Sequence, residues 1–243
     1  MGFQNRVTAK RSLGQNFLVN SGVIEKITTI VIDSKPKHIT EIGPGKGAFT
    51  KVFYGTTIPL TLIEKDNNLF QLLQNNYKNI ELYNLDFLDY KTSNFETTYF
   101  GSLPFNVSKE IIDKILKSET FKNPAFFIIQ KEVAEKYLNR NKNELGFTRE
   151  IYADFKILFD IKPGSFNPKP KVTSSFVKFI PNNHLGSINK QDLEILIQRS
   201  FKMPRKTLKN NLSTYGYKIP ENINNERATE LELDDYVSIL QHS

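Results

Sequence analysis

The chain carries the stretch EIGPGKG at residues 41–47, directly after a β-rich run and directly before a helical pattern. Glycines at such a junction let the backbone turn tightly and let a ligand approach the main chain. Glu64 ends the next β-rich run, about twenty residues further on, where an acid commonly binds the two hydroxyls of a ribose. The stretch therefore predicts a strand, a glycine loop and a helix that bind a nucleoside-containing cofactor.

The first 180 residues alternate short β-rich runs with helical patterns, which is typical of a doubly wound sheet. We predict strands at residues 38–42, 60–64, 80–84, 97–102, 125–130, 151–159 and 174–180. We predict helices at residues 21–31, 47–53, 67–75, 108–117 and 131–139. After residue 181 the pattern becomes helical, at 191–201, 205–212 and 233–240, and Pro204 suits the first position of a helix. We expect an α/β protein with a Rossmann-like cofactor-binding domain at 1–181 and a small α-helical lobe at 182–243.

The composition narrows the class of protein. Of the 243 residues 39% are hydrophobic, so the chain can bury a substantial core. The first residues are charged and lack the apolar core of a secretory signal, and no apolar run is long enough to span a bilayer, so we expect neither secretion nor a membrane partner. The absence of cysteine excludes disulfides and thiolate metal sites. A net charge of +7 favours a polyanionic partner such as a nucleic acid.

Two cofactors share this glycine loop and the acid that follows it, a dinucleotide and S-adenosylmethionine (SAM). The dinucleotide fingerprint G-x-G-x-x-G seats a pyrophosphate at the helix N-terminus. Here the third glycine comes one residue early and Pro44 lies inside the loop, which suits a cofactor without phosphate. Asp86, just past the third predicted strand, can accept a hydrogen bond from an adenine amino group. Against the alternative of a purely structural turn, acids on successive strands favour SAM.

A second stretch, YFGSLPFNVS at residues 99–108, is a hydrophobic strand that runs into a Ser-Leu-Pro-Phe corner and then a helix. A proline and an aromatic ring at a strand's carboxyl end lie at the rim of the sheet, where open α/β sheets bind ligands. The corner resembles the Asn-Leu/Ile-Pro-Tyr/Phe motif of methyltransferases that act on the exocyclic nitrogen of adenine. Ser102 departs from that motif, which begins with Asn or Asp.

Further motifs extend this resemblance over essentially the whole chain. They are RSLGQNFL at 11–18, QKEVA at 130–134, FNPKPKV at 166–172, RKTL at 205–208 and RATEL at 227–231. With the two stretches above, the chain resembles the rRNA adenine N6-dimethyltransferases, a family whose relatives include the Erm macrolide-resistance enzymes. The resemblance implies a Rossmann-like SAM-dependent methyltransferase sheet, SAM as the cofactor and adenine N6-methylation as the activity.

The resemblance also implies roles for individual residues around the cofactor. Gln15, Asn16 and Leu18 would close over the methionine end of SAM, or else they would tie the N-terminal segment to the core. The glycines would line SAM, Glu64 would hold its ribose and Asp86 its adenine. The implied cofactor residues are Gln15, Asn16, Leu18, Gly43, Gly45, Glu64, Asp86, Phe87 and Ser102.

The corner from Ser102 through Leu103 and Pro104 to Phe105 is the predicted catalytic site. The N6 nitrogen of adenine is a poor nucleophile because its lone pair is delocalised into the ring, so acceptors around the amine and an in-line geometry supply most of the catalysis. Ser102 Oγ and the Leu103 carbonyl are the expected acceptors. Phe105 is expected to stack on the target base and Phe166 to cover its other face, with core packing as the alternative for both rings. Ser102 leaves three hypotheses open: a slower enzyme, one with adjusted geometry, or a fold that has lost catalysis.

Ribosomal RNA, or a precursor of a ribosomal subunit, is the implied partner. Lys202, Arg205 and Lys206 belong to a basic cluster whose helical spacing suits phosphate contacts, the alternative being an ordinary solvated face. The motifs favour small-subunit rRNA as substrate. The alternatives are an Erm-type enzyme, which methylates large-subunit (23S) rRNA and gives macrolide resistance, and a catalytically silent RNA- or DNA-binding factor.

We expect a monomer in the cytoplasm or in an organelle of bacterial origin. A zinc deaminase, the other class of adenine-modifying enzyme, needs a cysteine-rich metal site. The chain has no cysteine, and its three histidines are widely scattered, so we expect no metal.

Overall fold

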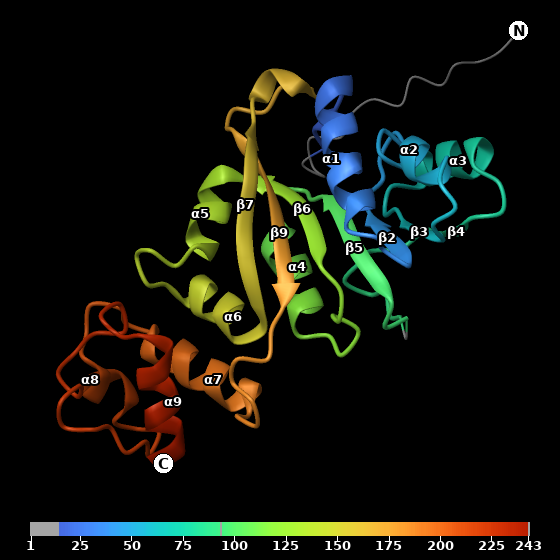
Figure 1. Cartoon of the computed structure of the whole chain (residues 1–243). Coiled ribbons are helices and arrows are strands. Elements are labelled where there is room, and N and C mark those ends of the chain that lie inside the picture. Colours follow the sequence, from blue (N-terminus) through green and yellow to red (C-terminus); the bar gives the residue numbers. More distant parts are fainter. Residues whose placement is uncertain (1–14, 93, 243) are drawn as a thin grey trace, which may run out of the picture. The chain divides into compact units, whose positions relative to one another are not determined.

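The computed structural model describes residues 15–92 and 94–242, which form two compact units (Figure 1). The first unit contains the described residues up to Lys131 together with Lys156–Ile180. The second contains Glu132–Phe155 together with the described residues from Pro181 onward. Residues 132–155, which the sequence placed with the first domain, therefore pack with the C-terminal helices. The motif residues 11–14 lie outside the described residues.

A seven-stranded sheet forms the centre of the first unit, in the order β4-β3-β2-β5-β6-β9-β7. Its strands are β2 (His38–Ile42), β3 (Leu60–Ile63), β4 (Glu81–Tyr83), β5 (Thr97–Ser102), β6 (Ala125–Gln130), β7 (Ala153–Ile161) and β9 (Ser174–Pro181). Neighbouring strands from β4 to β6 are parallel, and β9 is antiparallel to β6. The strand order reverses between β2 and β5, the point at which such sheets bind ligands. The predicted Rossmann-like α/β fold is confirmed.

Helices of this unit cover both faces of the sheet, and Figure 1 shows α1 in front of the strands and α4 behind them. The strands β2, β3, β5 and β6 are almost wholly buried, as expected of a parallel sheet covered on two sides. Two helices begin at capping residues, since the side chains of Asn20 and Asp66 accept hydrogen bonds from the first turns. The helices are α1 (Ser21–Asp33), α2 (Thr50–Tyr54), α3 (Asn67–Asn76) and α4 (Ser108–Leu116), and α5 (Lys131–Tyr137) continues into the second unit.

A small second sheet, absent from the sequence prediction, joins two distant segments of the first unit. Strand β1 (Phe17–Leu18) pairs antiparallel with β8 (Phe166–Asn167), with Leu18 opposite Phe166. The pairing continues into the backbone, where the amide of Val19 donates a hydrogen bond to the Ser165 carbonyl over 2.8 Å. The N-terminal motif is thereby held beside the FNPKPKV segment.

The second unit packs four helices around its own core, which includes Phe147, Leu196 and Tyr236. They are α6 (Glu144–Tyr152), α7 (Lys190–Ser200), α8 (Leu208–Leu212) and α9 (Leu233–His242). Helix α6 was not predicted, and because it extends to Tyr152 the strand expected at 151–159 begins only at Ala153. The expected helix 205–212 was also wrong at its start, since the side chain of Thr207 caps α8 and Pro204 lies outside any helix.

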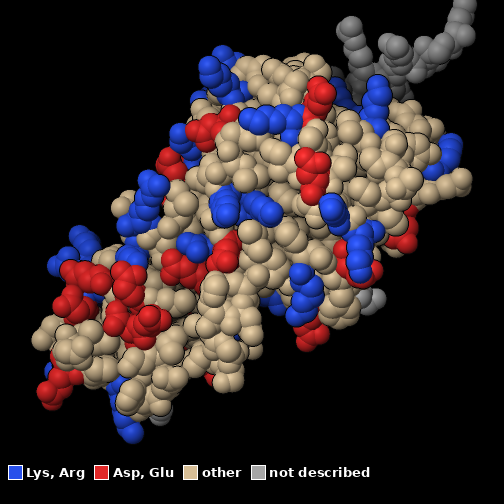
Figure 2. Space-filling view, in the orientation of Figure 1, with Lys and Arg blue, Asp and Glu red and all other residues tan. Residues whose placement is uncertain are grey.

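Among the described residues, no helix combines the length and the apolar character needed to cross a membrane. In the same residues, no group of three or more His, Cys, Asp or Glu side chains could hold a metal ion. Figure 2 shows basic and acidic side chains intermingled on the visible face rather than gathered into one single-sign surface.

Candidate active site

The carboxyl ends of four neighbouring parallel strands bring the predicted cofactor residues together. Gly43 follows β2, Glu64 follows β3, Asp86 comes after β4, and Ser102 ends β5. All four line one cavity of about 130 Å³, which we call the cofactor cavity. Its wall also contains, from the predicted cofactor set, Gln15, Gly45 and Phe87.

Glu64 is held by the backbone from both carboxylate oxygens. Its Oε2 accepts a hydrogen bond from the Gly45 amide over 3.0 Å, and its Oε1 accepts one from the Asp66 amide over 2.8 Å. Burial raises the pKa of Glu64, and these two hydrogen bonds act in the opposite direction. A carboxylate fixed in this way keeps further lone pairs for a diol, and donors from a ribose would offset the cost of burying its charge.

Glycine 45 is required by the close approach of an aromatic ring. Its φ is +60°, and a Cβ atom added there would lie 3.0 Å from Cε1 of Phe17. Phe17 in turn is placed by the β1–β8 pairing. The glycine loop and the N-terminal motif, far apart in the sequence, thus form one continuous wall of the cofactor cavity.

Asp86, in the wall of the same cavity, is also held by protein donors. Its Oδ2 pairs with Lys65 Nζ at 2.6 Å, and its Oδ1 accepts a hydrogen bond from the Leu88 amide over 2.9 Å. Burial acts to raise the pKa of Asp86, but these hydrogen bonds and the charges of Lys65 and Lys114 outweigh it and lower the pKa. Asp86 is therefore an ionised acceptor whose donors from the protein fix its direction.

The residues at this edge fit SAM. A buried carboxylate suits the ribose, an ionised carboxylate suits the adenine amine, and glycine backbone leaves the floor free of side chains. Leu69, Phe87 and Ile111 add apolar surface of the kind an adenine ring packs against.

A second cavity of about 370 Å³, which we call the substrate cavity, adjoins the first. It is lined by the predicted residues Leu103, Phe105 and Phe166, and also by Asn16 and Leu18. The two cavities share Gln15, Phe17, Ser102 and Pro104 in their walls. Asn16 and Leu18, implied for the cofactor, thus lie on the substrate side, whereas Gln15 faces both.

Phe17 and Lys46 line the substrate cavity and were not among the predicted site residues. Lys46 Nζ lies 4.9 Å from the centroid of the Phe17 ring, which places a cation at the cavity wall. Both residues stand inside motifs that the sequence had singled out, the glycine loop and GQNFL. Nothing in the sequence indicated that they lie together, because they are brought together by the pairing of β1 with β8, a contact between distant segments of the chain.

The predicted RNA-contacting residues Lys202, Arg205 and Lys206 belong to the second unit and are exposed. The expected helical face is wrong, because α7 ends at Ser200 and α8 begins at Leu208, so all three lie in the intervening turns. Their neighbour Arg199 packs on the Tyr215 ring, with its guanidinium carbon 4.3 Å from the ring centroid. The phosphate-binding role of the exposed three stays a prediction.

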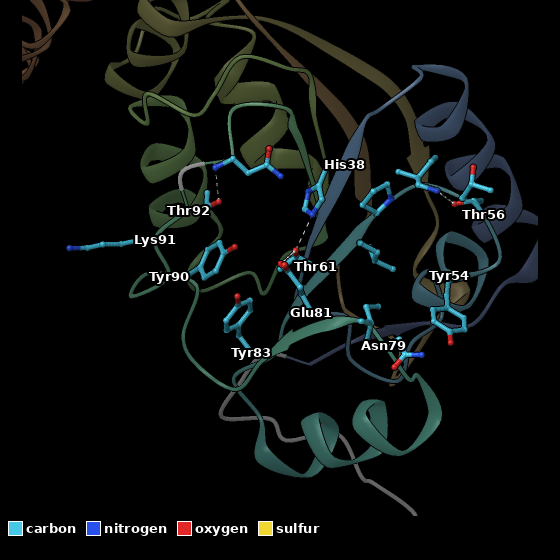
Figure 3. A pocket seen from close by; sticks show the side chains of 16 residues that line it. His38, Tyr54, Thr56, Thr61, Asn79, Glu81, Tyr83, Tyr90, Lys91 and Thr92 are labelled. Atoms are coloured by element: carbon cyan, nitrogen blue, oxygen red, sulfur yellow. Dashed lines mark hydrogen bonds between the residues drawn. The ribbon is translucent and has the colours of Figure 1, made fainter.

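The amino ends of the strands carry a different hollow, of about 660 Å³, shown in Figure 3. Its floor is a chain of side-chain hydrogen bonds. His38 Nδ1 lies 2.9 Å from Thr97 Oγ1, His38 Nε2 lies 3.0 Å from Thr61 Oγ1, and Thr61 donates to Glu81 over 2.7 Å. Since the single Thr61 hydroxyl proton goes to Glu81, His38 donates from Nε2 and, when neutral, accepts at Nδ1. The side chains of this hydrogen-bonded chain therefore serve as partners for one another.

Comparison with known proteins gives a consistent result. Residues 6–242 match the model of the family described as ribosomal RNA adenine dimethylase. The chain is 34% identical over 220 residues to a ribosomal RNA small subunit methyltransferase A of Malacoplasma penetrans, covering 87% of this chain and 80% of that protein. It is 32% identical over 256 residues to the protein of the same name from Francisella tularensis, covering 97% of this chain and 98% of the other.

Two solved structures share the fold across most of the chain. A dimethyladenosine transferase from Plasmodium falciparum superimposes with a TM-score of 0.78 at 21% identity, covering 93% of this chain and 96% of that one. The 23S rRNA methyltransferase ErmE superimposes with a TM-score of 0.71 at 19% identity, covering 93% and 99%.

Proposed function

The chain belongs to the ribosomal RNA adenine dimethylase family, and we propose that it transfers methyl groups from SAM to the N6 nitrogen of adenine in small-subunit rRNA. The observation that carries the proposal is the wall of Gln15, Phe17, Ser102 and Pro104 that the cofactor and substrate cavities share. A donor in one cavity and an acceptor base in the other would meet at that wall. This is the arrangement that an in-line transfer needs.

On the cofactor side, Glu64 would hold the ribose, and Asp86 and Phe87 the adenine. Bound there, SAM supplies an electrophilic methyl group on a sulfonium. The glycine backbone at residues 43–45 would carry the methionine end, with Gln15 at the boundary between the two cavities.

On the substrate side, Ser102 and Leu103 would accept hydrogen bonds from the adenine amine. Ser102 is half-buried, and its Oγ has no hydrogen-bond partner within the described part of the chain, so both lone pairs can face the base. The Leu103 amide donates to the Ile128 carbonyl over 3.0 Å, which ties the corner to the neighbouring strand β6. Two acceptors on a fixed corner favour the pyramidal amine of the transition state.

Phe105 and Phe166 would enclose the target base. Both rings line the substrate cavity, and Phe166 is held by the pairing of β8 with β1. A base that leaves its stack loses a few kcal/mol, and aromatic rings in the pocket offset part of that loss. The Lys46 side chain at the same wall would face the anionic backbone of the RNA.

The relatives at 32–34% identity are named for the small ribosomal subunit, which supports small-subunit rRNA over large-subunit rRNA as the substrate. We place the protein where ribosomal subunits are assembled, in the cytoplasm, and acting as a monomer. The exposed Lys202, Arg205 and Lys206 would add phosphate contacts from the second unit.

The test is methyl transfer from labelled SAM to separate small-subunit and large-subunit RNAs, and to a precursor particle of the small subunit, followed by mapping of the label. We expect label on N6 of small-subunit adenines. Label only in large-subunit RNA would assign an Erm-type substrate. No transfer by the wild type, with transfer by Ser102→Asn, would identify a silent RNA-binding protein.

A further inference from the structure

The turn at residues 86–90 carries Asp86 and Phe87 into the cofactor cavity but belongs to no helix or strand. Two backbone hydrogen bonds lie within the turn. The Asp89 amide donates to the Asp86 carbonyl over 2.9 Å, and the Tyr90 amide donates to the Phe87 carbonyl over 3.1 Å. These bonds leave the carbonyls of Leu88 and Tyr90 without a donor from the turn itself. Another part of the chain must hold it if its two side chains are to keep a fixed direction.

Lys114 supplies that support. Its ammonium group donates to the carbonyl oxygens of Phe87 over 3.0 Å, Leu88 over 2.5 Å and Tyr90 over 2.7 Å. An ammonium group has three N–H donors, so these contacts use all of them. Lys114 Nζ also lies 5.4 Å from the centroid of the Phe87 ring.

The position of Lys114 connects this turn to the catalytic corner. Lys114 lies on α4, the helix that begins at Ser108 directly after the Ser102–Phe105 corner. Ile111, one turn earlier on the same helix, lines the cofactor cavity. Burial lowers the pKa of Lys114, and the nearby charges of Asp89 and Asp86 act in the opposite direction.

We propose that Lys114 is a positioning residue for the adenine end of the cofactor: it clamps the 86–90 turn to α4, so that Asp86 and Phe87 meet the base in a fixed geometry. The inference rests on the proposed SAM site. In this proposal Lys114 contributes to recognition of the adenine base, and not to binding of the ribose or of the methionine end.

The test compares two ligands that differ only in the base, S-adenosylhomocysteine and S-inosylhomocysteine, which has an oxo group where adenine has its amine. Calorimetry gives both dissociation constants for wild type, Lys114→Met and Lys114→Arg, with Lys109→Met as the control from an exposed site on the same helix. We expect Lys114→Met to reduce the preference for the adenosyl ligand by about tenfold. Lys114→Arg, which keeps donors for the carbonyls, should retain most of the preference, and Lys109→Met all of it.

A merely structural lysine would lower the melting temperature without changing the ratio of the two dissociation constants. An unchanged ratio in folded Lys114→Met would overturn the inference, and if that variant does not fold, Lys114→Gln carries the same expectation. Failure of the proposed function looks different. In that case the wild type itself binds neither ligand or shows no preference between them.

Discussion

The two ends of the parallel sheet each open into a hollow, and the larger hollow is at the end that carries no predicted site. At the amino ends the hollow measures about 660 Å³, against about 130 and 370 Å³ for the cofactor and substrate cavities. At the amino ends His38, Thr61 and Glu81 hydrogen-bond to one another across three strands. At the carboxyl ends Glu64 is held by backbone amides, which leaves its outer lone pairs for a ligand.

In the proposed assignment, the site is located by the direction of the polar groups and not by the size of the cavity. A cross-strand chain such as His38–Thr61–Glu81 (Figure 3) stabilises the sheet by partnering its own members. The carboxylates of Glu64 and Asp86 are instead held by backbone amides and by Lys65, and they keep further lone pairs that can accept hydrogen bonds from a ligand in the cofactor cavity. Substitutions at matched positions of the two ends can test this distinction.

The largest effect is expected from Glu64→Ala. It removes the buried acceptor for the ribose, so SAM affinity should fall by roughly 1.5–3 kcal/mol, or about ten- to a hundredfold. Glu81→Ala is the matched change at the amino end and should leave SAM affinity unaltered. Calorimetry with SAM checks both, and equal losses in the two variants would remove the distinction between the ends.

Phe105→Ala should lower methyl transfer to RNA through the loss of base stacking, by about 1–3 kcal/mol. Tyr83→Ala is the control, since Tyr83 is an exposed aromatic ring at the amino-end hollow. Single-turnover transfer at subsaturating RNA measures the effect. A comparable loss in Tyr83→Ala would indicate that RNA also contacts the amino end.

Ser102→Ala should reduce turnover by about two- to tenfold, the range for a neutral hydrogen bond of 0.5–1.5 kcal/mol, with SAM affinity nearly intact. The lost acceptor acts mainly on the transition state, so the rate constant should fall and the dissociation constant should not. Ser102→Asn should preserve or raise the rate if the cavity admits the longer side chain. Rates equal to wild type in Ser102→Ala would leave Leu103 as the working acceptor.

The smallest effects are changes in the pH dependence of stability, and they should have opposite signs at the two ends. Burial raises the pKa of Glu41, behind the cofactor loop, to about 8, so the folded state keeps its proton after the unfolded state has lost it above 4.5. Stability is therefore lost as pH rises from about 4.5 to 8. Burial lowers the pKa of His38, so stability is lost as pH falls below 6.5.

Urea unfolding of Glu41→Gln and His38→Gln against wild type measures these two contributions. The free energy of unfolding of Glu41→Gln, relative to wild type, should rise between pH 5 and 8. That of His38→Gln, relative to wild type, should rise as pH falls below 6.5. A flat difference for either variant would show that the group titrates normally in the folded state.

The sequence was sufficient for the sheet and for the acids at its rim. The strands 38–42, 97–102 and 125–130 were predicted with the bounds they have, because their runs are rich in the β-branched and aromatic residues that favour strands. Glu64 and Asp86 were placed at one edge because parallel strands end on the same side.

What the sequence could not predict depends on contacts between distant segments. Phe17 and Lys46 come together at the substrate cavity through the pairing of β1 with β8. Strands of only two residues leave no sequence pattern from which that pairing could be predicted. The clamp by Lys114 needs the 86–90 turn to lie over α4. The basic turn at 202–206 was expected on a helix because charge spacing alone does not show where α7 ends.

Amide chemical-shift mapping during titration with S-adenosylhomocysteine tests most directly which end of the sheet is the site. We expect the changes to centre on Gly43, Gly45, Glu64 and Asp86, with the amides of His38 and Glu81 unmoved. Changes centred instead on His38 and Glu81 would contradict the assignment of the cofactor to the carboxyl ends of the strands.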